Sequence, residues 1–227
     1  MTGPLADSMR IGGLVPLTSI DFPGRLAAVL FCQGCPWQCG YCHNPHLIAP
    51  QAPPAMDWHD FVSFLQRRRG LLDGVVFSGG EPTLQAALPE AIRAVRRMDF
   101  QVALHTAGMY PDRLARVLPL VDWVGFDIKG PAHCHDAITG TPGGAARVMA
   151  SLDRVLASGV PYECRTTWDP ALFDEAALLA LAETLTARGV RHWSLQVCNR
   201  GGRPVPWPPS VAGRLASAFP QLMLRTA

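Results

Sequence analysis

The stretch LAAVLFCQGCPWQCGYCHNP, residues 26–45, joins an apolar run of strand length to a loop rich in cysteine. Its first six residues are hydrophobic without a break, as in a strand that is buried on both faces. Cys35, Cys39 and Cys42 follow within eight positions. Functional groups of α/β proteins collect beyond the carboxyl ends of parallel strands, so this loop is the first candidate for a functional site.

Downstream of this loop, apolar runs alternate with amphipathic segments. The segments GVVFS, QVALHT, WVGFDIK and HWSLQV predict further strands at residues 74–78, 101–106, 123–129 and 192–197, and YECRTTW at 162–168 is expected to be extended as well. Apolar residues at helical spacing predict helices at residues 57–70, 88–98, 111–118, 145–159, 174–189 and 211–219. This alternation predicts about six βα units and a parallel sheet.

The chain has 227 residues, fewer than the ~250 that are typical of a full eight-unit barrel. We therefore predict an α/β fold, a partial, open-sided (β/α)6 barrel of parallel strands, with a doubly wound sheet as the alternative. Residues 1–227 are interpreted as a single domain, although the length alone would also allow two. Residues 199–227 should form a loop, including GGRPVPWPPS at 201–210, and a last helix.

The composition excludes several classes of protein. Charged residues make up 17% and hydrophobic residues 48% of the chain, as in globular proteins. A formal net charge of +2 is too small to indicate a nucleic-acid surface, and no apolar run is long enough to span a membrane. The amino-terminal residues do not resemble a signal peptide, so we expect a cytoplasmic protein with seven reduced cysteines.

The cysteine loop can be interpreted in two ways. With Cys32 included, it contains two C-x2-C pairs, which could supply a zinc site of four thiolates. Such pairs are usually about 15 to 20 residues apart, whereas here only three residues separate them, a spacing that favours an iron-sulfur cluster. Cys32 then lies at the end of a strand and points into the core, and the isolated cysteines are also structural: Cys134, Cys164 and Cys198.

The C-x3-C-x2-C spacing on the loop after the first predicted strand resembles the signature of the radical S-adenosylmethionine superfamily. The resemblance implies that Cys35, Cys39 and Cys42 hold three irons of a [4Fe-4S] cluster. It also implies that S-adenosylmethionine chelates the fourth iron and is cleaved by one electron to a 5′-deoxyadenosyl radical.

A second motif, SGGEPTLQ at residues 78–85, follows the next predicted strand. Alone it would indicate a tight turn, in which two glycines let the backbone approach a ligand. One βα unit after the cysteine loop, it resembles the superfamily segment that holds the ammonium of the methionine moiety. The resemblance implies this role for Gly79, Gly80 and Glu81, and a place near the adenine for Tyr41.

Further motifs resemble the activases of glycyl radical enzymes, most closely those of anaerobic ribonucleoside-triphosphate reductase. They are LTSIDFPG, CHNP, GFDIKG and YECRTT, and the resemblance covers a core of about residues 17–198. It implies that five more residues line the S-adenosylmethionine pocket: Thr106, Asp127, Lys129, Arg165 and Gln196. The alternatives are structural, because Asp127 and Lys129 share one face of a strand and could form an ion pair, and Arg165 could cap the sheet end.

The chain departs from these activases at three places. His105 and Ala107 flank the threonine of HTAG, where relatives carry an acidic and an Asn-like residue, so a cation site built on that acid is not expected. His105 should instead be a hydrogen-bonded residue at the sheet end, or a pH-sensitive contact. Cys32 stands where threonine is common, and no inserted ferredoxin-like domain follows Cys42.

The resemblance implies a hydrogen-atom abstraction from a glycine of a partner enzyme, such as the reductase large subunit, with a flavodoxin- or ferredoxin-type electron donor. The small net charge and the lack of a long apolar run lead us to expect no nucleic-acid or membrane partner. Two other functions stay open. The first is a radical enzyme that modifies a small molecule in nucleoside or cofactor biosynthesis, although DFPG (21–24) and CHNP (42–45) favour the activases. The second is a non-catalytic four-cysteine metal module that binds a partner.

Overall fold

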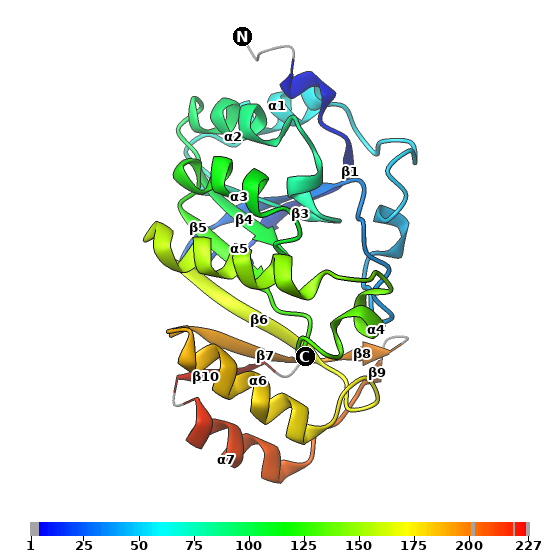
Figure 1. Cartoon of the computed structure of the whole chain (residues 1–227). Helices are drawn as coiled ribbons and strands as arrows, with labels where there is room; N and C mark the ends of the chain where they lie inside the picture. The colour runs from blue at the N-terminus through cyan, green and yellow to red at the C-terminus, as the bar shows by residue number, and fades with distance from the viewer. Residues whose placement is uncertain (1–4, 201–202, 220, 226–227) are drawn as a thin grey trace.

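The computed structural model describes residues 5–200, 203–219 and 221–225. It contains one sheet of eight strands in the order β1-β2-β3-β4-β5-β6-β7-β10 (Figure 1). The six strands expected from the sequence run parallel and follow one another in chain order. They are β2 (Ala27–Cys32), β3 (Gly74–Gly79), β4 (Gln101–Thr106), β5 (Trp123–Asp127), β6 (Tyr162–Trp168) and β7 (Trp193–Val197). The doubly wound alternative is wrong, because the strand order of such a sheet reverses at a switch point.

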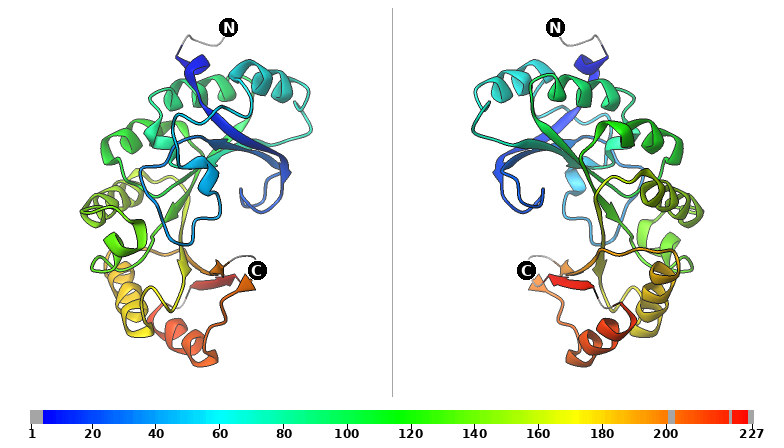
Figure 2. Two further views of the ribbon diagram at one scale, coloured as in Figure 1. Left: turned by 90° about the vertical axis from the view of Figure 1, so that its right-hand side faces the viewer. Right: turned by 90° about the vertical axis from the view of Figure 1, so that its left-hand side faces the viewer.

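Except for α4 (His135–Thr139), which lies beside the loop that contains the cysteines, the α-helices lie along the outer side of the curved sheet (Figure 1 and Figure 2). Aspartates cap two of them: the Asp57 carboxylate accepts a hydrogen bond from Asp60 N, and Asp174 accepts one from Ala177 N. No helix in the described ranges is long and apolar enough to cross a membrane. The α-helices are α1 (Trp58–Gln66), α2 (Leu88–Arg96), α3 (Pro111–Val117), α4 (His135–Thr139), α5 (Ala145–Ser158), α6 (Glu175–Ala187) and α7 (Pro209–Ala218), and the 3-10 helices are η1 (Ala6–Ser8), η2 (Pro45–Leu47), η3 (Pro82–Leu84) and η4 (Leu118–Leu120).

Both edges of the sheet are strands that the sequence analysis missed. β1 (Ile11–Thr18) pairs antiparallel with β2, and its two glycines and a proline concealed it. β10 (Leu222–Arg225) pairs parallel with β7, and four residues are too few for a clear pattern. β8 (Asn199–Arg200) and β9 (Arg203–Pro204) form a short ladder in the predicted loop. Within the described residues β1 and β10 each have one neighbouring strand, so the barrel is partial and open-sided, as predicted.

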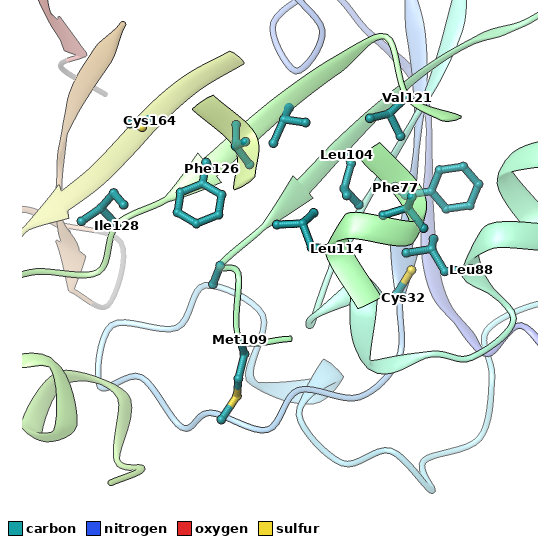
Figure 3. Close-up of a cluster of buried hydrophobic side chains, with 14 of the residues drawn as sticks. Cys32, Phe77, Leu88, Leu104, Met109, Leu114, Val121, Phe126, Ile128 and Cys164 are labelled. Atoms are coloured by element: carbon teal, nitrogen blue, oxygen red, sulfur yellow. The ribbon is translucent and has the colours of Figure 1, made fainter. Parts of the chain in front are cut away.

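The parallel strands are buried on both faces. On the helix side, side chains of successive strands pack against side chains of the helices. Cys32 of β2 and Phe77 of β3, for example, belong to the same buried cluster as Leu88 of α2 (Figure 3). On the opposite face, Phe22 and Trp123 belong to a smaller apolar cluster. Burial on both faces explains why β2 to β5 appear in the sequence as largely apolar runs.

Candidate active site at the carboxyl ends of the strands

A cavity of about 240 Å³ lies at the carboxyl ends of the strands. The cysteine loop forms one wall, and the ends of β3 to β7 form the others. Every residue that the sequence analysis assigned to the site lines this cavity: Cys35, Cys39, Tyr41, Cys42, Gly79, Gly80, Glu81, Thr106, Asp127, Lys129, Arg165 and Gln196. The structure therefore brings together residues that are up to 161 positions apart in the chain.

The cavity also contains residues that the sequence analysis did not assign to it: Trp37, His43, Asn44, Ile48, Ser78, His105, Ala107 and Thr167. The alternation of side chains along a strand could have indicated Thr167, because it lies two residues after Arg165 on the same face of β6. Its hydroxyl is 3.5 Å from Oε1 of Gln196 on β7. No comparable signal in the sequence marks Ile48.

Hydrogen bonds join the two ends of the cysteine loop, residues 33–35 and 47–49, which together form its neck. Gly34 N donates to Leu47 O at 2.7 Å, and Cys35 N donates to Ile48 O at 3.0 Å. The buried side chain of Gln33 donates from Nε2 to Ala49 O at 2.7 Å. These contacts fix where the loop leaves and rejoins the barrel, independently of any metal.

Three cysteines of the loop face the cavity and the fourth does not. Cys35 and Cys39 are half-buried and Cys42 is exposed, whereas Cys32 is fully buried in the core on the helix side. Burial raises the pKa of the Cys35 thiol to about 11 and also raises the pKa of Cys39. Among the described residues, no three Cys, His, Asp or Glu side chains converge closely enough to hold a single metal ion.

The glycine pair of SGGEPTLQ brings the end of β3 against the cysteine loop. Gly79 has a φ of 107°, and a Cβ there would overlap the backbone of Cys32. A Cβ on Gly80 would overlap the carbonyl of Gly34. Gly80 N donates to Cys32 O at 2.9 Å, and Glu81 N donates to Gly34 O at 2.9 Å. We expected the missing side chains of the two glycines to make room for a ligand. In the structure they make room for the backbone of the cysteine loop.

The carboxylate of Glu81 joins the ends of two strands. It is buried and accepts hydrogen bonds from Thr83 N at 3.1 Å, Thr83 Oγ1 at 2.5 Å and Thr106 Oγ1 at 2.7 Å. Its second oxygen accepts from Ala107 N at 2.9 Å. These contacts hold the turn after β3 to the turn after β4, so Glu81 fixes the shape of the cavity wall.

The predicted charged residues form a compact ionic cluster. Lys129 Nζ is 3.0 Å from Asp127 Oδ2, and Arg165 Nη2 is 2.9 Å from Asp127 Oδ1. Burial alone would raise the pKa of Asp127, but Arg165 and Lys129 lower it overall, so the carboxylate stays ionised. Lys129 Nζ also lies 6.0 Å from the centre of the Tyr41 ring, within cation–π range. The ion pair that we considered as a structural alternative does form.

His105 is fully hydrogen-bonded at the end of β4. Nε2 is 2.9 Å from Asp21 O and therefore donates, while Nδ1 accepts from Ser78 Oγ at 3.3 Å. Arg165 Nη1 is 3.3 and 3.4 Å from the two ring nitrogens, so the guanidinium lies against the imidazole. Burial, followed by the charge of Arg165, lowers the pKa of His105 to about 3. The ring is therefore neutral and links the DFPG turn to three strands.

We expect His105 to make the cofactor-free protein less stable as the pH falls. The unfolded chain binds a proton at this residue below about pH 6.5, whereas the folded protein does so only near pH 3. Arg165 opposes protonation and Asp127 favours it. Between pH 7 and pH 5 the free energy of unfolding should fall by about 2 kcal/mol on account of this residue. Urea unfolding at both pH values checks this.

The matched variant is His105→Gln, which cannot titrate. Its unfolding free energy should change by about 2 kcal/mol less than that of the wild type between the two pH values. Equal pH dependence in the two proteins would contradict a neutral, buried His105.

The fold and the cavity are those of a class of enzyme that is built on an α/β barrel. In this protein, thiols and charged side chains meet at the carboxyl ends of the strands. Residues 29–195 match the family described as the radical SAM superfamily. The chain belongs to this superfamily, whose members use a [4Fe-4S] cluster and S-adenosylmethionine.

Two curated relatives and one solved structure show what the chain is similar to. A protein of Methanocaldococcus jannaschii, named as a glycyl-radical enzyme activating enzyme, is 29% identical over 77% of this chain and 75% of its own. A 7-carboxy-7-deazaguanine synthase of Methanopyrus kandleri is 30% identical over 49% of this chain and 52% of its own. A domain of a pyruvate-formate lyase-activating enzyme from Bacteroides vulgatus superposes with a TM-score of 0.56 at 19% identity, covering 68% of this chain and 98% of that one.

The donor groups of the cavity fit the cofactors of the superfamily. Three thiols suit three irons of a cluster, and cationic and anionic side chains suit the charged ends of a methionine moiety. The buried hydroxyl of Tyr41, a residue that lines the cavity, has no hydrogen-bond partner among the described residues. Such a group indicates a place for a ligand atom or a water molecule.

Proposed function

We propose that this protein is a glycyl-radical-enzyme activase. One observation carries the proposal: Cys35, Cys39 and Cys42 line the cavity, while Cys32 is buried in the core behind it. A cluster of four irons on three thiolates keeps one iron for a ligand from outside the protein, and in this superfamily that ligand is S-adenosylmethionine.

Held by Cys35, Cys39 and Cys42, the cluster and S-adenosylmethionine would supply one-electron reductive cleavage of the cofactor and, with it, abstraction of a hydrogen atom from a glycine Cα. The chain itself binds, orients and excludes water. We assign Lys129 and Arg165 to the side of the pocket that receives the carboxylate of S-adenosylmethionine, and Asp127 to holding these two cations in place. The remaining contacts are assigned to Tyr41, Thr106 and Gln196 and to the main chain of Gly79, Gly80 and Glu81, because the Glu81 carboxylate is occupied by hydrogen bonds within the protein.

The open side of the barrel supports a protein substrate. β1 and β10 are the two ends of the sheet, and within the described residues no strand joins them. A loop of another protein could therefore approach the cavity from the side. For the partner we propose the large subunit of anaerobic ribonucleoside-triphosphate reductase, and for the electron donor a flavodoxin- or ferredoxin-type protein. The chain would act as a single domain.

Anaerobic reconstitution tests this function. The protein is loaded with iron and sulfide, reduced, and mixed with S-adenosylmethionine and a partner labelled with [α-²H]glycine. We expect 5′-deoxyadenosine that carries deuterium, and a glycyl radical signal in the electron paramagnetic resonance spectrum of the partner. A reconstituted protein that forms no 5′-deoxyadenosine under any of these conditions would overturn the proposal.

A second function, modification of a small molecule, is favoured by the similarity to the 7-carboxy-7-deazaguanine synthase. The same assay separates the two. If unlabelled 5′-deoxyadenosine forms and the glycine of every candidate partner keeps its deuterium, the small-molecule function replaces the activase.

A further inference from the structure

We propose that residues 131–144, between β5 and α5, brace the cysteine loop, and that His135 is a positioning residue that acts through Trp37. This proposal rests on the assignment of a cluster to Cys35, Cys39 and Cys42, and does not depend on which partner the enzyme activates. Figure 1 shows α4, which belongs to this segment, beside the blue loop that contains the cysteines.

Two hydrogen bonds tie this segment to the loop on either side of Trp37. Gln38 N donates to Thr139 O at 2.8 Å, and Thr141 Oγ1 donates to Pro36 O at 3.2 Å. Pro36 and Gln38 are the two neighbours of Trp37 and lie between the first two cysteines of the motif. The brace therefore holds the part of the loop that sets the distance between Cys35 and Cys39.

Trp37 and His135 pack against each other beneath the loop. Each is only 2% exposed, and their ring centres are 5.1 Å apart at an interplanar angle of 78°. Trp37 also belongs to the lining of the cavity that the cysteines line. An edge-to-face contact of this kind has a defined geometry, so the position of one ring determines that of the other.

Packing, not hydrogen bonding, holds His135 in place. Neither ring nitrogen has a hydrogen-bond partner in the described parts of the chain, and Asp136 Oδ1 is 3.7 Å from Nδ1. On the side of α5, a Cβ on Gly144 would come within 2.5 Å of Cε1 of His135. The imidazole is thus confined between the backbone of Gly144 and the Trp37 ring.

This arrangement would shape the loop before the cluster binds. Hydrogen bonds to Leu47 and Ile48 fix only the neck of the loop. A second group of contacts at Trp37 fixes the segment between the thiols, which lowers the entropy that cluster binding must remove. Groups that orient metal ligands from behind typically change metal affinity by about 10- to 100-fold when they are mutated.

Three variants test the brace: His135→Ala removes the ring, Thr141→Val removes one hydrogen bond at constant shape, and Gly144→Ala pushes the ring towards Trp37. The matched control is Gly213→Ala in α7, where a Cβ meets nothing within 4 Å and φ is ordinary. In cluster-free protein we expect amide exchange of residues 34–45 to be about fivefold faster in Thr141→Val, the effect of one hydrogen bond. In reconstituted protein we expect iron to pass to a chelator about tenfold faster in His135→Ala.

The double variant His135→Ala with Gly144→Ala separates positioning from general destabilisation. If Gly144→Ala acts by displacing the imidazole, it should have no further effect once the imidazole is gone. Exchange and iron loss equal to those of Gly213→Ala in all three single variants would overturn the proposal. So would exchange that rises evenly along the chain, because that is the mark of a lower global stability. Failure of the activase assay with these results intact would overturn the proposed function alone.

Discussion

Replacement of Cys35 by alanine is expected to remove the bound iron and abolish the cleavage of S-adenosylmethionine, whereas replacement of Cys32 leaves both in place. Cys35 lines the cavity, and a cube that is left with two thiolates has no stable set of protein ligands. Cys32 is fully buried among helix-side residues, and burial strongly raises the pKa of its thiol. A thiol in that position stays protonated and is a poor metal ligand.

The measurement is iron and sulfide content after anaerobic reconstitution, together with 5′-deoxyadenosine formation. Cys32→Ala should lower the free energy of unfolding by about 1 kcal/mol, because it leaves a small void in the core. Cys164→Ala, at another fully buried cysteine of the sheet, is the matched control for that loss. If Cys32→Ala loses iron as completely as Cys35→Ala, the site is a closed set of four thiolates and the radical mechanism fails.

Replacement of Glu81 by alanine should lower the free energy of unfolding of the cofactor-free protein by about 3 kcal/mol. The carboxylate accepts from the backbone amides of Thr83 and Ala107 and from the hydroxyls of Thr83 and Thr106. The hydroxyls can rotate towards other acceptors, but the two amides stay buried without a partner, at a cost of about 1 to 3 kcal/mol each.

Urea unfolding of the cluster-free protein measures this effect. Glu90→Ala on the surface of α2, which removes ion pairs to Arg93 and Arg97, is the control and should change stability little. If Glu81→Ala weakens the binding of S-adenosylmethionine but unfolds at the same urea concentration as the control, Glu81 acts as a ligand and does not hold the two strand ends together.

The sequence predicts the strands β2 to β5 well because they are buried on both faces and so form largely apolar runs. β2 and β3 are the clearest examples. β1 is not predicted by the same pattern, because it is an edge strand that carries Gly12, Gly13 and Pro16. β10 is not predicted either, because so short a strand is defined by its pairing with β7 and not by a pattern in its own sequence.

The place of the site is also predictable, since motifs that follow strands of a parallel sheet meet at one edge. The contacts of Gly79 and Gly80 are not. Whether a missing Cβ faces a ligand or another segment of backbone depends on the distance to the cysteine loop, which no local pattern contains. The contact between Trp37 and His135 is hidden for the same reason, because the two residues belong to segments far apart in the chain.

The closed neck of the cysteine loop has a consequence for an enzyme that meets oxygen. Gly34, Cys35 and Gln33 anchor that neck to main-chain carbonyls and not to metal. Oxidative loss of the iron-sulfur cluster would therefore leave the two ends of the cysteine loop in place and the protein folded. Repair would then require only fresh iron, sulfide and reductant, with no renewed synthesis of the protein.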